Sequence, residues 1–130
     1  MRERIKAWKI AWEKDKSCFI SVTDLTIGTG PLVQFGDDVT LRYFMRGGNI
    51  DAIVCLQSES DGELLKVGDA TTLPKGVSQG LIGMCVGGKR VVHIPSKFGY
   101  GNRKNRPALL KAYESLFFEC ELIAIKSSSH

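Results

Sequence analysis

The side chains that most often carry chemistry are few in this sequence and far apart along it. Four cysteines are present, and no two of them form a C-x-x-C pair, the spacing of a zinc or redox site. They are Cys18, Cys55, Cys85 and Cys120. Each lies among apolar residues, so we expect buried free thiols in a reducing compartment. His93 is the only histidine before the C-terminal residue. We find no Ser-His-Asp order, metal cluster or phosphate-binding loop, and therefore expect no cofactor.

The most informative stretch runs from residue 74 to residue 101 and reads PKGVSQGLIGMCVGGKRVVHIPSKFGYG. It predicts a short helix near residues 75–82, in which Val77 and Leu81 share one face at i and i+4. Three glycines at 83, 87 and 88 then end the helix and let the chain reverse. Residues 89–94 are rich in β-branched types and predict a strand, which Pro95 terminates.

Other segments predict further strands. Residues 19–43 contain two, joined by a glycine-rich link, and residues 115–126 contain another. The segment GELLKVGD, at residues 62–69, predicts a strand with Leu65 and Val67 pointing inward.

The run GLIGMCVGGKRVVHIPSKFGYG resembles the core signature of the FKBP family of peptidyl-prolyl isomerases. That signature is Gly-x-x-x-Met-x-x-Gly, a basic residue, a strand, a proline and a loop closing on Tyr-Gly. The upstream Gly36-Asp37-x-Val39 and the closing strand SLFFECELIAIK also match, so the resemblance covers about residues 19–126. It implies an α+β fold, in which an antiparallel sheet wraps around one short helix.

The activity implied by the resemblance is cis/trans isomerisation of X-Pro bonds, which uncatalysed takes tens of seconds. Such catalysis needs no metal or nucleophile, because an apolar pocket that removes water from the imide favours the twisted state. The family pattern assigns Tyr43, Tyr100 and Phe118 to the pocket, with Leu73 as an apolar wall. Leu109 or Leu110 would contribute from the following loop. The same aromatic residues could equally be ordinary core residues.

Three positions depart from the family pattern. Val77 stands where the family has a tryptophan. Pro74 stands where a backbone N–H holds the substrate or macrolide carbonyl, and proline has no N–H. By spacing, Ile53 and Val54 occupy the first two positions of the family's Phe-Asp-Ser-Ser, so its aspartate is absent, although Asp51 lies two or three places earlier.

These departures predict weak or absent isomerase activity and weak or absent macrolide binding. One function class is therefore a module that binds a protein partner or a proline-containing peptide with little catalysis. The alternative is an active FKBP-type isomerase that assists protein folding. A fold alone does not decide between them.

Residues 1–17 predict an amphipathic helix in front of the domain at 18–126. Ile5, Trp8 and Trp12 lie at i, i+3 and i+7. Trp8 and Trp12 are candidate anchors, because two exposed indoles on a short helix would bind other apolar surfaces. The helix either packs against its own domain, links it to a neighbouring domain or binds a partner. Interspersed acidic residues disfavour a membrane helix, and residues 127–130, SSSH, predict a disordered tail.

Residues 102–112 form a basic loop that includes Arg103, Lys104 and Arg106. The loop is either a solvated segment or a contact for an acidic partner. Aromatic residues do not alternate with these charges, so nucleic acid is not favoured as a partner.

Length and composition fit one ordinary globular domain. The chain has 130 residues, 43% hydrophobic and 25% charged, with a net charge of +4. No apolar run approaches the roughly 20 residues that cross a bilayer, and no secretory signal is evident. We therefore expect no membrane partner and a cytoplasmic or nuclear location.

Overall fold

The computed structural model of the protein describes residues 19–71 and 73–126. Its elements are β1 (Ser21–Thr26), β2 (Asp38–Gly47), β3 (Val54–Gln57), β4 (Glu63–Lys66), α2 (Lys75–Leu81), β5 (Lys89–Ile94), the 3-10 turn η1 (Ser96–Phe98) and β6 (Leu116–Lys126). The helix expected at 1–17, with Trp8 and Trp12, and the tail expected at 127–130 lie outside the described residues.

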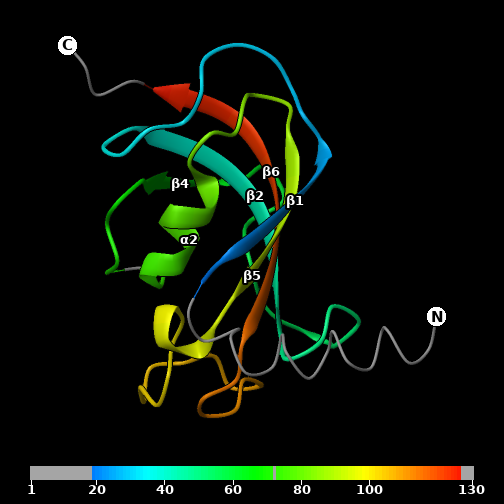
Figure 1. Cartoon of the computed structure of the whole chain (residues 1–130), viewed down its shortest axis with the longest axis vertical. Coiled ribbons are helices and arrows are strands. Elements are labelled where there is room, and N and C mark those ends of the chain that lie inside the picture. Colours follow the sequence, from blue (N-terminus) through cyan, green and yellow to red (C-terminus); the bar gives the residue numbers. More distant parts are fainter. Residues whose placement is uncertain (1–18, 72, 127–130) are drawn as a thin grey trace.

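The six strands form one sheet with the order β1-β5-β6-β2-β3, and β4 pairs with β2 beside β3. Every pairing is antiparallel. Figure 1 shows β2 and β6 curving past α2, which packs on one face of the sheet. The predicted α+β architecture, a sheet around one short helix, is confirmed.

The two central strands supply most of the core through regular alternation. In β2 and β6 every second side chain is buried and faces the helix, because strand side chains alternate between the two faces. These residues are Val39, Leu41, Tyr43 and Met45 in β2, and Leu116, Phe118, Cys120 and Leu122 in β6. On the outer face the intervening positions carry ion pairs, such as Arg42 with Glu121 at 3.2 Å.

Helix α2 approaches β5 closely because two of its residues have no side chain. A Cβ on Gly76 would lie 2.5 Å from Cγ2 of Ile94, and one on Gly80 would lie 2.5 Å from Cγ1 of Val92. Real Cβ contacts are longer than this, so only glycine permits the observed packing. The two glycines therefore fix both the distance and the rotation of the helix on the sheet.

Arg90 of β5 ties the end of α2 to β1. Its Nη1 donates to the backbone carbonyls of Gly80 and Ile82 at 2.8 and 2.9 Å, and its Nε donates to Oδ1 of Asp24 at 2.7 Å. Helix C-termini leave carbonyls without intrahelical donors. The buried guanidinium satisfies two of them, which joins three elements at one residue.

The local predictions are largely confirmed. The helix expected at 75–82 spans 75–81, and the strand expected at 89–94 has those bounds. Strand β2 extends four residues beyond Tyr43, to Gly47, because it pairs with β6 and β3 along that length. Val67 is buried, and Leu65 packs against the core. No helix among the described residues is long and apolar enough to span a membrane.

The thiols are less uniformly buried than the sequence predicts. Cys85 and Cys120 are buried, whereas Cys55 on β3 is only half-buried, and all three are free. Strand β3 lies at the margin of the sheet, where fewer neighbours cover it. Cys18 lies outside the described residues.

Candidate functional site

Five of the residues assigned to the pocket lie together in the core between the sheet and α2. They are Tyr43, Leu73, Val77, Tyr100 and Phe118, and we call them the site cluster. Their exposed fractions run from 0% for Phe118 to 5% for Leu73 and Tyr100. The rings of Tyr43 and Phe118 stack with centroids 5.0 Å apart and an interplanar angle of 27°. The cluster is thus a packed, mainly aromatic part of the core, supplied by β2, β6, α2 and the segments beside the helix and β5.

Tyr43 contributes the polar feature of the cluster. Its hydroxyl donates to Oε1 of Glu63 at 3.1 Å. Burial raises the pKa of Tyr43 well above its ordinary value, and the neighbouring carboxylate of Glu63 adds to that shift. Burial also raises the pKa of Tyr100. Both hydroxyls therefore remain protonated donors at neutral pH.

Glu63 is a site residue that the sequence analysis missed. Strand β4 pairs Glu63 with Leu41 and Leu65 with Val39, which places Glu63 on the core-facing side of the sheet. The sequence did contain a signal for this position. Glu63 lies two residues before Leu65 and four before Val67, so strand alternation places all three side chains on one face, and the other two are predicted to point inward. A carboxylate at such a position is unusual.

Pro74 begins the helix beside the cluster. It is the N-cap of α2 with φ −58°, and its side chain is almost fully buried. Its carbonyl accepts a hydrogen bond from the Val77 N–H at 3.0 Å. The ring nitrogen carries no hydrogen, so this point of the helix start offers no donor to a ligand.

Ile53 and Val54, which spacing places at the family's Phe-Asp positions, lie outside the buried core. Ile53 is 78% exposed and lies outside the site cluster, and Asp51 is also exposed. Val54 is half-buried at the start of β3. Leu56, opposite Met45, packs against the core, as does its neighbour Cys55.

Ser58, the residue after β3, is joined to Tyr43 by two hydrogen bonds. Oγ of Ser58 accepts a hydrogen bond from the Tyr43 N–H at 2.9 Å, and the Ser58 N–H donates to the Tyr43 carbonyl at 3.1 Å. These bonds continue the pairing of β2 with β3 by one residue beyond Gln57, which lies opposite Phe44.

The loop after Tyr100 turns Leu110 inward and Leu109 outward. Leu110 is 4% exposed and belongs to the core, whereas Leu109 is 63% exposed. Of the two candidates, Leu110 is therefore the one beside the cluster. Arg106 orders this loop, because Nε donates to the Leu110 carbonyl at 3.0 Å and Nη1 donates to the Arg103 carbonyl at 2.8 Å. Arg103 and Lys104 are exposed.

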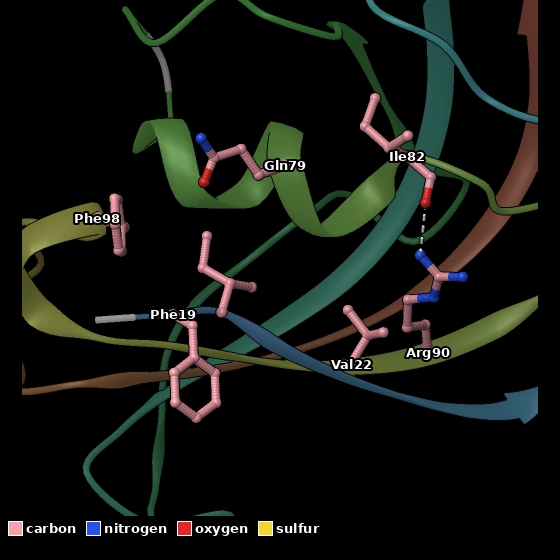
Figure 2. Close-up of a pocket in the computed structure, with 7 residues that line it drawn as sticks. Phe19, Val22, Gln79, Ile82, Arg90 and Phe98 are labelled. Atoms are coloured by element: carbon pink, nitrogen blue, oxygen red, sulfur yellow. Dashed lines mark hydrogen bonds between the residues drawn. The ribbon is translucent and has the colours of Figure 1, made fainter. Parts of the chain in front are cut away.

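A separate hollow lies on the other flank of α2. Figure 2 shows Gln79 and Ile82 on its helix side and Phe19 and Val22 on its β1 side, with Arg90 donating to the Ile82 carbonyl. The cavity holds about 450 Å³ and is also lined by Ile20 and Phe98. Helical periodicity directs Val77 and Leu81 to the opposite flank, so this hollow is distinct from the site cluster. Among the described residues, no three His, Cys, Asp or Glu side chains are grouped as a metal site would need.

A family model described as FKBP-type peptidyl-prolyl cis-trans isomerase matches residues 31–123. The chain belongs to the FKBP family. An FK506-binding protein of Streptomyces anulatus is 32% identical to this FKBP chain over 111 residues, which cover 82% of this chain and 86% of that protein. Peptidyl-prolyl cis-trans isomerase FKBP15-1 of Arabidopsis thaliana is 37% identical over 92 residues, but this chain spans only 58% of its length.

The fold agrees with that of solved FKBP relatives. A peptidyl-prolyl cis-trans isomerase from Pseudomonas syringae pv. tomato superposes with a TM-score of 0.72 at 27% identity, covering 94% of this chain and 92% of that one. The resemblance read from residues 80–101 is therefore confirmed at the level of family and fold.

Proposed function

We propose that this FKBP domain binds proline-containing segments of partner proteins and accelerates X-Pro isomerisation weakly or not at all. Family membership supports binding of peptidyl-prolyl groups. The site cluster keeps the aromatic residues of the family pattern, against which a prolyl ring would pack.

Pro74 carries the proposal about catalysis. It holds the position at which the family pattern places a backbone N–H for the substrate carbonyl, and it is fixed there as the buried N-cap of α2. No rotamer or loop shift restores a donor to proline. A lost hydrogen bond costs about 1 kcal/mol, and each 1.36 kcal/mol lost from transition-state stabilisation lowers the rate about tenfold.

Two further positions act in the same direction. Val77 presents two methyl groups where the family has an indole, and truncating a packed aromatic residue costs on the order of 3–5 kcal/mol. By spacing, Val54 stands where the family pattern has an aspartate. If these losses fall on the transition state, turnover drops by several orders of magnitude.

Binding and catalysis are tested separately on the same peptide. The exchange rate between cis and trans acetyl-Ala-Leu-Pro-Phe-amide is measured by magnetisation transfer with and without protein. Arabidopsis FKBP15-1 serves as the positive control, being named an isomerase. We expect amide signals near Leu73 and Tyr100 to shift on adding the peptide, while the exchange rate stays near background.

Variants identify the cause of the low rate. Val77→Trp alone should not raise the rate while Pro74 remains, whereas Pro74→Ile combined with Val77→Trp should raise it. Acceleration by the unmodified domain comparable to that of the positive control would establish the active isomerase instead. Absence of any shift near Leu73 and Tyr100 would contradict peptide binding.

A further inference from the structure

A carboxylate occupies a core-facing position of the sheet at the edge of the site cluster. Glu63 lies opposite Leu41 on the inner face, while the next residue, Leu64, points outward and is 70% exposed. Ordinary alternation would place the leucine inside and the glutamate outside. A one-residue shift of register would exchange the two, so the observed pairing holds the charge inward.

Glu63 separates the buried tyrosine from solvent. Tyr43 is 2% exposed, Glu63 is half-buried, and 3.1 Å separates the Tyr43 hydroxyl from Oε1 of Glu63. The hydroxyl can donate only one hydrogen bond, and the carboxylate takes it. A ligand carbonyl at this edge therefore finds no free donor on Tyr43, but it finds a negative charge.

No basic residue neutralises that charge within residues 19–71 and 73–126. The ion pairs of the described chain use other carboxylates, namely Asp24, Asp38, Glu119 and Glu121. A carboxylate has several acceptor positions and Tyr43 fills one of them. A cationic donor on a bound peptide would fill another acceptor position of the Glu63 carboxylate with a charge-assisted hydrogen bond, which is stronger than a neutral one.

We propose that Glu63 makes this site selective for segments in which Lys or Arg immediately precedes proline. The proposal rests on the proposed function, because it assumes that the peptide binds at the site cluster. The whole chain carries a net charge of +4 and so repels basic peptides at long range. The preference must therefore be local, and at physiological ionic strength charges more than about 8 Å apart are largely screened.

Three peptides that differ in one residue test this selectivity. Acetyl-Ala-Lys-Pro-Phe-amide, its Leu-Pro analogue and its Glu-Pro analogue are titrated at physiological salt, and Kd is measured from amide shifts near Leu73 and Tyr100. We expect the Lys-Pro peptide to bind about fivefold to tenfold more tightly than the Leu-Pro peptide, the range of a partly exposed charge-assisted contact. The Glu-Pro peptide should bind least tightly.

The matched variants are Glu63→Gln and Glu59→Gln. Both remove one negative charge, but the amide oxygen of Glu63→Gln can still accept from Tyr43, and Glu59 is exposed after β3. The Lys-Pro preference should disappear in the first variant and persist in the second. A salt series on the unmodified protein provides a test that needs no variant, because the preference should weaken as salt rises.

The results of the titrations test the Lys-Pro selectivity and peptide binding separately. Equal binding of Lys-Pro and Leu-Pro peptides, or a preference that survives Glu63→Gln, would overturn the selectivity and leave peptide binding intact. A preference lost equally in Glu59→Gln would show a general charge effect and would also overturn it. If none of the three peptides shifts the signals near Leu73 and Tyr100, both the proposed function and the selectivity fail.

Discussion

Tyr43 makes contacts with three different parts of the domain. Its ring stacks on Phe118, its backbone N–H donates to Ser58, and its hydroxyl donates to Glu63. One residue of β2 thus contacts β6, β4 and the residue that follows β3. Replacing Tyr43 by phenylalanine removes only the hydroxyl and leaves the ring and the backbone N–H in place, so the variant measures the contribution of the hydroxyl alone.

We expect Tyr43→Phe to lower the free energy of unfolding by about 1 kcal/mol, because a half-buried carboxylate loses its donor. Urea denaturation of the variant and the unmodified domain measures the difference. In a Glu63→Gln background Tyr43→Phe should lower the free energy of unfolding by less, because leaving a neutral amide oxygen without a donor costs less than leaving a carboxylate without one. Equal losses in both backgrounds would show that the charge of Glu63 does not contribute.

The buried thiol of Cys120 should make the free energy of unfolding fall with rising pH in the alkaline range. Burial raises the pKa of its thiol from 9.0 to about 12, although the charge of Arg90 opposes the shift. The unfolded thiol therefore loses its proton first, so its contribution is fully present below pH 9.0 and is lost as pH rises toward 12. By pH 10 the loss should be about 1 kcal/mol.

The measurement is the free energy of unfolding in urea between pH 7 and pH 10. Tyr43 and Tyr100, whose pKa values are also raised, add to the loss near pH 10, so the effect of Cys120 is taken as the difference between variants with and without its thiol. Burial also raises the pKa of Cys55, so Cys55→Ser is the reference background. Adding Cys120→Ser should flatten the pH profile, and an unchanged slope would assign the effect to another group.

At the level of elements, the contact between α2 and β5 reverses the usual effect of a helical glycine. Replacing glycine by alanine in an exposed helix stabilises it by about 1 kcal/mol. Gly80→Ala should instead destabilise this domain by about 1–3 kcal/mol, because the new Cβ would lie 2.5 Å from Cγ1 of Val92. Thermal and urea unfolding measure the change.

Two comparisons separate packing from helix propensity. Gln79→Ala, on an exposed position of the same helix, should be nearly neutral. In a Val92→Ala background, where the clashing methyl groups are gone, Gly80→Ala should cost less than in the unmodified domain. A stabilising Gly80→Ala would show that α2 moves freely away from β5.

The loop after Tyr100 offers a second matched pair. Leu110→Ala should lower the free energy of unfolding by about 2–5 kcal/mol, because Leu110 is 4% exposed. Leu109→Ala, at 63% exposure, should change it by less than about 0.5 kcal/mol. Similar losses for the two would mean that the loop does not hold the observed conformation in solution.

For the whole molecule, the role of residues 1–17 remains a prediction. Replacing Trp8 and Trp12 together with alanine should lower the melting temperature if they anchor to their own domain, or abolish an oligomer if they bind another copy. Calorimetry and mass in solution distinguish these results. A variant unchanged in both would indicate that the segment is a passive linker.

Local signals predicted the parts of the fold that depend on local physics. Gly87 and Gly88, with Pro95 after the strand, bound β5 within a few residues, and the i, i+4 pair Val77 and Leu81 located α2. The family signature in this stretch identified the overall architecture. These features need no information about distant segments.

The remaining site residues depended on register and loop length. Spacing alone did not show that Ile53 is exposed, because the length of β2 and of its following turn is set by pairing with β3 and β6. No periodicity distinguished Leu109 from Leu110 in an irregular loop. Glu63 was missed because a charged side chain is expected to face solvent. Strand alternation with Leu65 and Val67 nevertheless places it on the core-facing side of the sheet.

The position of β6 has a consequence for how the protein is made. It is the last strand of the domain, yet it lies between β5 and β2, and its final residue, Lys126, pairs with Asp38. A chain emerging from the ribosome therefore cannot assemble the sheet until residue 126 has cleared the exit tunnel. Until then the apolar rows of β2 and β5 have no central partner, and such exposed strands are prone to aggregate. Pairing over so many residues is also slow, so we expect the sheet to form only after residue 126 has emerged, and shorter nascent chains to need protection by chaperones.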